Sequence, residues 1–378
     1  MEEATTYKLG DISTMKYGKL PPKYINEGNY PIWSGYRYVG KCNEFNCNKG
    51  DIIIVARGVG GTGDVKIAKE DCYLTNLSIQ VKLDKNICQP EYFYYSYLLS
   101  NLKYLDSGSA QSQITIEDLK RLEVTLPPLE QQHKITDILK SIDEKIELNR
   151  QINDNLEQQA QALYKSWFVD FEPFKDGEFI ESELGKIPEG WQCIPFSMFV
   201  TESKAKTGKI GIKEYSVTNN GIFPRDAKYN KSLSQSSTKN KLILYGDLVF
   251  GMSRDILNWG VMQEEQGGVS SAYTVYNINS GIVNSTYLEL FIKSRIHLFS
   301  DLIRPAAREG QGIDKSVLQT KVLLYPPQEV LDTFWPLYNS VTNQIQTTTT
   351  EINCLGDVRD TLLPKLMSGE LKINEIDC

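Results

Sequence analysis

The sequence lacks the features that membrane, secreted and disulfide-bonded proteins need. No apolar run approaches the roughly 18–20 residues that a membrane-spanning helix requires. The first residues, "MEEATTYKLGD", form neither a basic nor an apolar segment, so no signal peptide is expected. The 7 cysteines are an odd number at irregular spacings, which argues against a disulfide framework and for a reducing compartment. These absences predict a cytoplasmic protein.

Residues that carry catalysis are also scarce. There are only 2 histidines, His133 and His297, and neither lies in a recognisable nucleophile motif. Cys42 and Cys47 have no second pair at metal-ligand spacing, so no metal site is expected. The glycines of Gly58–Gly63 match a dinucleotide-binding pattern, but the alternating residues that follow predict a strand instead of the required helix. We therefore predict a turn between strands there, and no catalytic residue is assigned.

The net charge of -7 is unevenly distributed. Residues 1–128 carry 15 basic and 15 acidic side chains, and residues 173–325 carry 18 and 16. The excess of acid lies in residues 129–172 and 326–378, with 5 basic against 9 acidic and 3 against 8. Within Lys204–Lys241, 9 basic residues face 2 acidic ones, a surplus that could bind a phosphate backbone or could be a solvated loop.

The chain contains an internal repeat with an offset of about 199 residues. "NKGDIIIVARG" (Asn48–Gly58) resembles "LYGDLVFGMSR" (Leu244–Arg254), and each predicts a turn followed by a buried strand. "SAQSQITIEDLKRLEVTLPP" (Ser109–Pro128) resembles "REGQGIDKSVLQTKVLLYPP" (Arg308–Pro327) in the same way. Each half is predicted to be a mixed α/β globule followed by a helix. The predicted domains are residues 1–128, 129–172, 173–327 and 328–378.

Both predicted helices carry apolar residues that alternate by four and three, which is the heptad seam of a coiled coil. We expect these residues to pair the two helices: Ile135, Leu139, Ile142, Ile146, Leu156, Leu163, Trp167, Val341, Ile345, Ile352, Leu355, Leu362 and Leu366. Four polar seam residues are expected to fix register: Asn149, Asn153, Thr348 and Arg359. Pro364 is expected to bend or end the second helix near its last turn.

Chain connectivity favours an antiparallel helix pair, because each helix leaves its own globule. The predicted fold class is therefore α+β, with two similar mixed α/β domains separated by two long antiparallel coiled-coil helices and related by a pseudo-two-fold axis. A helix of 33 residues is about 50 Å long, which exceeds what one small domain can cover.

Three segments resemble the specificity (S) subunit of type I restriction-modification enzymes. The stretch that begins "LPPLEQQHKITDILKSIDEKIELN" at Leu126 and ends "LYKSWFVDFEPF" at Phe174 is similar to that family's central conserved region. "GKIPEGWQ" (Gly185–Gln192) resembles the start of its second recognition domain, and "LLPKLMSGEL" (Leu362–Leu371) resembles its C-terminal conserved region. The second helix departs from the pattern, with "YPPQEVLDTF" at its start and "TTTT" (Thr347–Thr350) inside it.

The resemblance implies a bacterial or archaeal protein without catalysis of its own. Each globule would be a target recognition domain that reads one half of a bipartite sequence in double-stranded DNA. The helices would set the half-site spacing and bind two methyltransferase (M) subunits, and restriction (R) subunits would complete the complex. S-adenosylmethionine, ATP and Mg would be bound by the partner subunits, with no cofactor on this chain.

Side chains that contact bases or phosphates are expected on glycine-containing loops of the two globules. The candidates for DNA binding are Tyr36, Arg37, Arg57, Gln111 and Gln113 in the first half, and Asn219, Arg225, Lys228, Ser253, Arg254, Arg304, Arg308 and Gln311 in the second. An alternative hypothesis keeps the helices but removes the DNA: a coiled-coil scaffold that joins two protein-binding globules.

Overall fold

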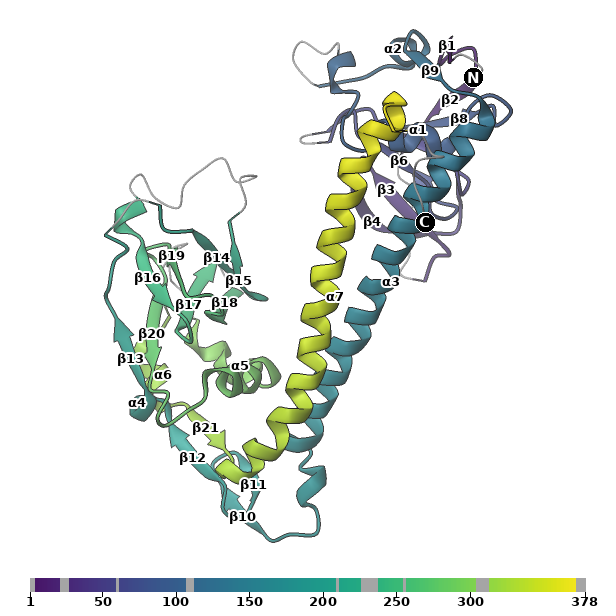
Figure 1. Ribbon diagram of the computed structural model, residues 1–378. Helices are drawn as coiled ribbons and strands as arrows, with labels where there is room; N and C mark the ends of the chain where they lie inside the picture. Colours follow the sequence, from purple (N-terminus) through teal and green to yellow (C-terminus); the bar gives the residue numbers. More distant parts are fainter. Residues whose placement is uncertain are drawn as a thin grey trace. The chain divides into compact units, whose positions relative to one another are not determined.

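The computed structural model describes residues 4–20, 27–58, 61–106, 112–208, 211–225, 237–253, 256–303 and 313–371. The chain forms two compact units (Figure 1). Unit 1 consists of Met1–Asp154 and Ile345–Cys378, and unit 2 consists of Asn155–Gln344. Each unit therefore combines one globule with part of each long helix. No helix in the described part of the chain has both the length and the apolar content needed to cross a bilayer.

Unit 1 is built on an antiparallel sheet with the strand order β2-β8-β5-β6. A second sheet has the order β4-β3-β7, and β1 pairs with β9. The elements are β1 Thr5–Lys8, β2 Ser13–Tyr17, β3 Tyr30–Ser34, β4 Arg37–Cys42, β5 Ile52–Val55, β6 Val65–Ile67, β7 Tyr73–Leu74, β8 Ser78–Leu83, α1 Pro90–Ser96, η1 Lys103–Leu105, α2 Ile116–Lys120 and β9 Glu123–Leu126. All four residues of β5 are buried, as the apolar run predicted.

The glycines of Gly58–Gly63 lie in the connection from β5 to its antiparallel partner β6, so a strand and not a helix follows them. Gly63 has a φ of +94°, and a Cβ there would lie 2.4 Å from the backbone nitrogen of Lys103. Only glycine fits this close approach. The connection between strands is confirmed, and because strand β6 follows the glycines, the helix that a dinucleotide site requires is missing there.

Unit 2 repeats this arrangement with a sheet of order β13-β20-β17-β18 and further strand pairs. Its elements are η2 Glu172–Phe174, β10 Phe179–Ser182, β11 Gly185–Pro188, β12 Gln192–Pro195, α4 Phe196–Phe199, β13 Val200–Ser203, β14 Tyr215–Thr218, β15 Gly221–Pro224, η3 Ser237–Lys239, β16 Lys241–Leu244, β17 Leu248–Ser253, β18 Ile256–Val261, β19 Gln266–Val269, β20 Thr274–Ile278, α5 Ser285–Ser294, η4 Ile296–Leu302, α6 Lys315–Thr320 and β21 Val322–Tyr325. Beside the four-stranded sheet, unit 2 contains the two-stranded antiparallel pairs β10-β11, β12-β21, β14-β15 and β16-β19.

The predicted duplication is confirmed by the matching order of the elements. The strand pair β1-β9 corresponds to β12-β21, and helix α2 corresponds to α6. Short polar residues start these helices in both units: Thr115 forms a capping box with Asp118, and Asp314 accepts from the backbone N–H of Ser316 and Val317. A strand and a proline pair then lead into the long helices α3 Leu129–Phe168 and α7 Gln328–Ser368.

Helices α3 and α7 pair in antiparallel orientation (Figure 1). In unit 1, Asp143 contacts Arg359, Asn149 donates to Glu351 at 2.9 Å, and Asn153 donates to Thr349 at 3.0 Å. Residue numbers therefore rise along α3 as they fall along α7. In unit 2, Phe334 of α7 lies against Phe168 of α3, with ring centroids 4.6 Å apart.

Every one of the thirteen apolar residues predicted to pair the helices is buried or half-buried, and none is exposed. The fully buried ones are Ile135, Leu139, Ile146, Leu156 and Leu366. The seam does more than join helices, because Ile135, Leu139 and Leu366 also belong to the core of unit 1. Helix α7 continues through Pro364 to Ser368, and it ends at Gly369, whose φ is +73°. A glycine in this conformation is the usual C-terminal stop of a helix.

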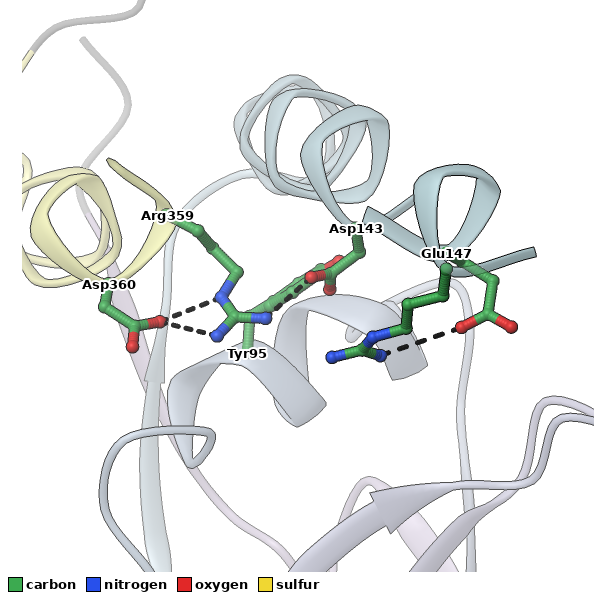
Figure 2. A network of polar contacts seen from close by, with 6 residues as sticks. Tyr95, Asp143, Glu147, Arg359 and Asp360 are labelled. Atoms are coloured by element: carbon green, nitrogen blue, oxygen red, sulfur yellow. Dashed lines mark hydrogen bonds and ion pairs between the residues drawn. The ribbon is translucent and has the colours of Figure 1, made fainter. Parts of the chain in front are cut away.

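A polar network in unit 1 joins α1, α3 and α7, and Figure 2 shows it from close by. The Asp143 carboxylate accepts from the Tyr95 hydroxyl at 2.8 Å and from Arg359 Nη1 at 2.7 Å. The guanidinium also contacts Asp360 at 2.7 Å. Burial and the Asp143 hydrogen bond raise the pKa of Tyr95, so the tyrosine remains a neutral donor. Arg359, which was predicted to fix the register of the helix pair, therefore contacts a carboxylate on each helix: Asp143 on α3 and Asp360 on α7.

Unit 2 holds its part of the helix pair with aromatic side chains instead. Phe334 is fully buried, and the ring centroids of Tyr164 and Trp167 lie 6.4 Å and 5.6 Å from its own. Phe168 in turn packs edge-on against Tyr287 of α5 at 5.2 Å. Aromatic pairs of this geometry stabilise a protein by about 0.5–1.5 kcal/mol beyond their burial.

A half-buried carboxyl group of unit 2 is paired with an amide. Glu289 of α5 accepts a hydrogen bond from Gln263 at 2.7 Å, and burial raises its pKa from 4.5 to about 7 despite the nearby Lys293. Burial and the Glu289 carboxylate together raise the pKa of Tyr338 on α7. The folded state therefore favours the protonated form of Glu289, so its contribution to stability is fully present below about pH 4.5 and is lost as the pH rises through about 7.

Replacing Arg359 by alanine should lower the free energy of unfolding by about 1–3 kcal/mol, because the half-buried Asp143 loses its charge partner. The double variant Asp143→Ala/Arg359→Ala should be destabilised by less than the sum of the single variants, as measured by urea denaturation. Arg150→Ala is the matched control, since its ion pair with Glu147 is exposed and 3.8 Å long. Equal effects of Arg150→Ala and Arg359→Ala would contradict the role of the network.

Replacing Glu289 by glutamine should stabilise the protein by about 1–3 kcal/mol at pH 8 and leave it unchanged at about pH 4. Glutamine cannot ionise, so it removes the cost of the partly desolvated negative charge that appears above about pH 7. Thermal melting across this pH range measures the difference. Glu264→Gln, at an exposed position, should show no such pH-dependent gain, and a parallel gain there would refute the assignment.

Candidate nucleic-acid interface

Two of the predicted residues of unit 1 meet at the end of strand β5. Arg57 follows β5 and forms an antiparallel bridge with Gln113, which comes from the loop before α2. The neighbouring backbone supports the bridge, because the N–H of Ile114 donates to the carbonyl of Ala56 at 2.9 Å. The Arg57 N–H donates to the carbonyl of Leu77 at 3.2 Å. Residues far apart in the sequence thus lie side by side, while Gln111 lies outside the described residues.

The turn between β3 and β4 packs against Arg57 at the end of strand β5. A Cβ on Gly35, whose φ is +61°, would lie 3.5 Å from the carbonyl oxygen of Arg57. Next along the turn, Tyr36 lies over Gly61, where a Cβ would come within 2.8 Å of the Tyr36 ring. Gly61 therefore leaves room for the tyrosine.

Arg37 is held on the face of Tyr36. Its Nε donates to the Tyr36 hydroxyl at 2.9 Å, and its guanidinium carbon lies 5.1 Å from the ring centroid. A cation over an aromatic ring is a modestly favourable arrangement that keeps the guanidinium at the surface. We use the name loop cluster for Tyr36, Arg37, Arg57 and Gln113. The structure brings together four of the five residues predicted for this half.

The loop cluster has hydrogen-bonding capacity that the described residues do not use. The Nε of Arg57 is buried and has no hydrogen-bond partner among them. A buried donor without a partner costs about 1–3 kcal/mol, unless a ligand supplies the acceptor. The loop that presents Gln113 is itself well held, because Asp106 accepts from Ser112 Oγ at 2.5 Å and from the Gln113 N–H at 2.7 Å. The arrangement can offer arginine, amide and phenol groups to acceptors on a partner.

The predicted residues of unit 2 are less concentrated. Asn219 is exposed at the turn between β14 and β15. Arg225 follows β15 at the opposite end of this hairpin, where its N–H donates to Glu214 and its Nη1 donates to Ser216 at 3.2 Å. Ser253 is the last residue of β17. The remaining predicted residues lie outside the described part of the chain: Lys228, Arg254, Arg304, Arg308 and Gln311.

The structure adds a pair of lysines that the predicted set omitted. Lys206 and Lys241 face each other across an antiparallel bridge in unit 2. Like charges directly opposite each other destabilise a sheet, so an anion beside the pair is favourable, and the Glu202 carboxylate already acts on Lys241. Lys241 is half-buried, with its Nζ donating to the carbonyl of Tyr273 at 2.6 Å, and burial lowers its pKa. The surplus of basic residues in Lys204–Lys241 was the sequence signal for this pair, although it did not identify these two members.

Side chains that could bind a metal do not gather in the described residues. These include no cluster of three or more histidine, cysteine, aspartate or glutamate side chains with the spacing to hold a metal ion. Glu202, whose carboxylate acts on the pKa of Lys241, is already bonded to Lys315 at 2.5 Å. That contact lowers the pKa of Glu202.

Comparison with known proteins agrees with the resemblance noted in the sequence. A family model described as the type I restriction modification DNA specificity domain matches residues 1–158. The chain is 28% identical over 373 residues to the type I restriction enzyme MjaIX specificity subunit of Methanocaldococcus jannaschii, covering 93% of this chain and 84% of the relative. It is 42% identical over 113 residues to the HindI specificity subunit of Haemophilus influenzae, covering 28% of this chain and 24% of that protein.

The fold is also found among solved structures. The type I restriction-modification S subunit from M. genitalium aligns over 96% of both chains with a TM-score of 0.56 and 16% sequence identity. At this identity the likeness concerns the fold alone. The match of residues 1–158 to the family model, together with relatives that align along most of the chain, supports a type I restriction enzyme specificity subunit.

Proposed function

We propose that unit 1 and unit 2 each read one half of a bipartite DNA target and that the chain selects the sequence on which a type I restriction-modification complex acts. The observation that carries this proposal is the loop cluster, where segments from three parts of the sequence bring Tyr36, Arg37, Arg57 and Gln113 together. Arginine binds guanine edges and phosphates with two parallel hydrogen bonds, and glutamine similarly matches adenine.

The unpaired Arg57 Nε supports the assignment, because a nucleic acid offers acceptors on both its bases and its phosphates. In unit 2, the Lys206–Lys241 pair would contact the phosphate backbone. The three described candidates of unit 2, Asn219, Arg225 and Ser253, remain part of the proposal. So do the candidates outside the described residues: Gln111, Lys228, Arg254, Arg304, Arg308 and Gln311.

Helices α3 and α7 are 40 and 41 residues long, or about 60 Å at 1.5 Å per residue. We propose that they set the distance between the two half-sites and bind two methyltransferase subunits on their acidic outer faces. Restriction subunits would join the complex through those partners. S-adenosylmethionine, ATP and Mg would be bound by the partner subunits, and this chain would contribute no catalytic group. The proposed setting is the bacterial or archaeal cytoplasm.

When the full chain is expressed with its methyltransferase partner, host DNA should acquire one bipartite methylated motif. Sequencing of methylated bases with and without this gene measures it, and the methyltransferase alone is the control. If no motif depends on the gene, the proposal is wrong, and the scaffold that joins two protein-binding globules becomes the better hypothesis.

Arg57→Gln should weaken or change recognition of one half of the motif by about 10–100-fold, because one bidentate contact is worth about 1–3 kcal/mol. The other half and the gap length should stay the same, since unit 2 and both helices are unaltered. The methylated-motif profile is the readout. Arg121→Gln is the matched control, because Arg121 is an exposed arginine at the end of α2 that lies outside the loop cluster. A change in both halves, or none, would exclude Arg57 as a reader of one half-site.

A further inference from the structure

Cys47 and Cys72 lie directly opposite each other in unit 1. They form an antiparallel bridge in which the Cys47 N–H donates to the Cys72 carbonyl at 3.0 Å and the Cys72 N–H donates to the Cys47 carbonyl at 2.9 Å. Both side chains are almost completely buried, at 0% and 1% exposure, in a small apolar cluster with Ile53, Ala68 and Leu74. The fold thus holds as neighbours two thiols that are distant in the sequence.

The spacing of such a pair permits a disulfide but strains it. Residues that exchange both backbone hydrogen bonds have Cα atoms about 5.5 Å apart, within the roughly 4.4–6.8 Å that a disulfide spans. Their Cβ atoms stand farther apart than the ~3.8 Å that disulfides prefer. Strained disulfides are easily reduced, so this pair would cycle between two states and would not act as a permanent cross-link.

Cys72 borders a cavity, although only 1% of its own surface is exposed. It lines a cavity of about 1010 Å³ that also borders Trp33, Lys66, Tyr94 and Tyr97. Cys47 does not line this cavity. The geometry therefore separates the two thiols into one that borders the cavity and one behind it.

The ionisation of the two thiols follows the same division. The neighbouring Cys47 thiol lowers the pKa of Cys72, although burial and the carboxylates of Glu70, Asp71 and Asp51 oppose it. The pKa of Cys47 is raised by the same contact and by burial. Because Cys72 borders the cavity and Cys47 does not, the position of the cavity assigns Cys72 as the thiol that an oxidant meets first.

We propose that Cys72 and Cys47 are a peroxide-sensitive thiol pair, with Cys72 the site of oxidation and Cys47 the resolving cysteine. The Cys72 thiolate attacks one oxygen of hydrogen peroxide, the O–O bond breaks, and the sulfur becomes a sulfenic acid as hydroxide leaves and takes up a proton to form water. The Cys47 sulfur then attacks the sulfenic sulfur, the S–S bond forms, and a second water leaves. Two thiols lose two electrons and two protons in total, and the peroxide is reduced to two waters.

The cross-link would close a loop around part of the candidate interface. Arg57 and the β5–β6 connection lie between Cys47 and Cys72 in the sequence, so the disulfide would tie together the two ends of the segment that carries Arg57. Closing such a loop restricts the unfolded chain, while strain in the folded state offsets that gain. This inference concerns the thiol pair itself and does not depend on DNA recognition.

The test treats the intact full-length chain with hydrogen peroxide, removes the peroxide with catalase, unfolds the protein, and alkylates the remaining thiols with N-ethylmaleimide. Digestion without reductant should then yield one dominant cross-linked peptide joining Cys47 to Cys72, which dithiothreitol separates.

Two variants separate the roles of the cysteines. In Cys47→Ser, Cys72 should accumulate as the sulfenic acid and react with dimedone, because no resolving thiol remains. Cys88→Ser is the matched control: Cys88 is equally buried but is not part of the bridged pair, so the Cys47–Cys72 peptide should still form. Complete alkylation of both Cys47 and Cys72 after peroxide treatment of the wild-type chain, or a dominant disulfide to any other cysteine, would overturn the proposal.

Discussion

The structure depends on the antiparallel pairing of α3 with α7, because each globule completes its core with residues from both helices. The core of unit 1 contains Ile135 and Leu139 of α3 together with Leu363 and Leu366 of α7. In unit 2, the same positions are taken by Tyr164 and Phe168 of α3 and by Leu331 and Phe334 of α7. Neither half of the sequence therefore buries its own apolar surface without a helix that belongs to the other half. The helices are part of both cores as well as connections between them.

The first turns of α3 and α7 show how one architecture is stabilised by different chemistry. At the start of α3, Gln132 is fully buried and bonded at both ends of its amide: it donates to the carbonyls of Ile87 and Pro127, and it accepts from the N–H of Gln89. The corresponding residue of α7 is Leu331, which is buried among apolar side chains. A hydrogen-bonded amide fixes direction as well as position, whereas an apolar residue fixes position through shape. The glutamine of the "PPLEQQ" motif is therefore explained by the backbone groups that it satisfies.

The same division into polar and apolar contacts continues along the helix pair. Unit 1 uses Asp143, Arg359 and Tyr95, and unit 2 uses Phe334 against aromatic residues of α3. Buried polar partners specify one register, because a slipped helix would leave charges unpaired. Aromatic packing contributes more burial but tolerates small shifts. The two units can therefore share one fold although different side chains hold the helix pair in each of them.

The sequence by itself determined the duplication, the fold class, the starts of both long helices and the residues of their seam. These follow from local rules: apolar residues at heptad spacing, proline pairs that end strands, and capping residues at helix starts. Of the two outcomes expected at Pro364, a bend or an end, the helix does not end at the proline itself, because α7 continues to Ser368. Only the tertiary structure decided that Arg57 lies beside Gln113, that Arg225 lies apart from Asn219, and that Lys206 faces Lys241. Strand pairing between distant segments sets these neighbours, and a pattern of residues along one segment contains no information about which distant segment will lie next to it.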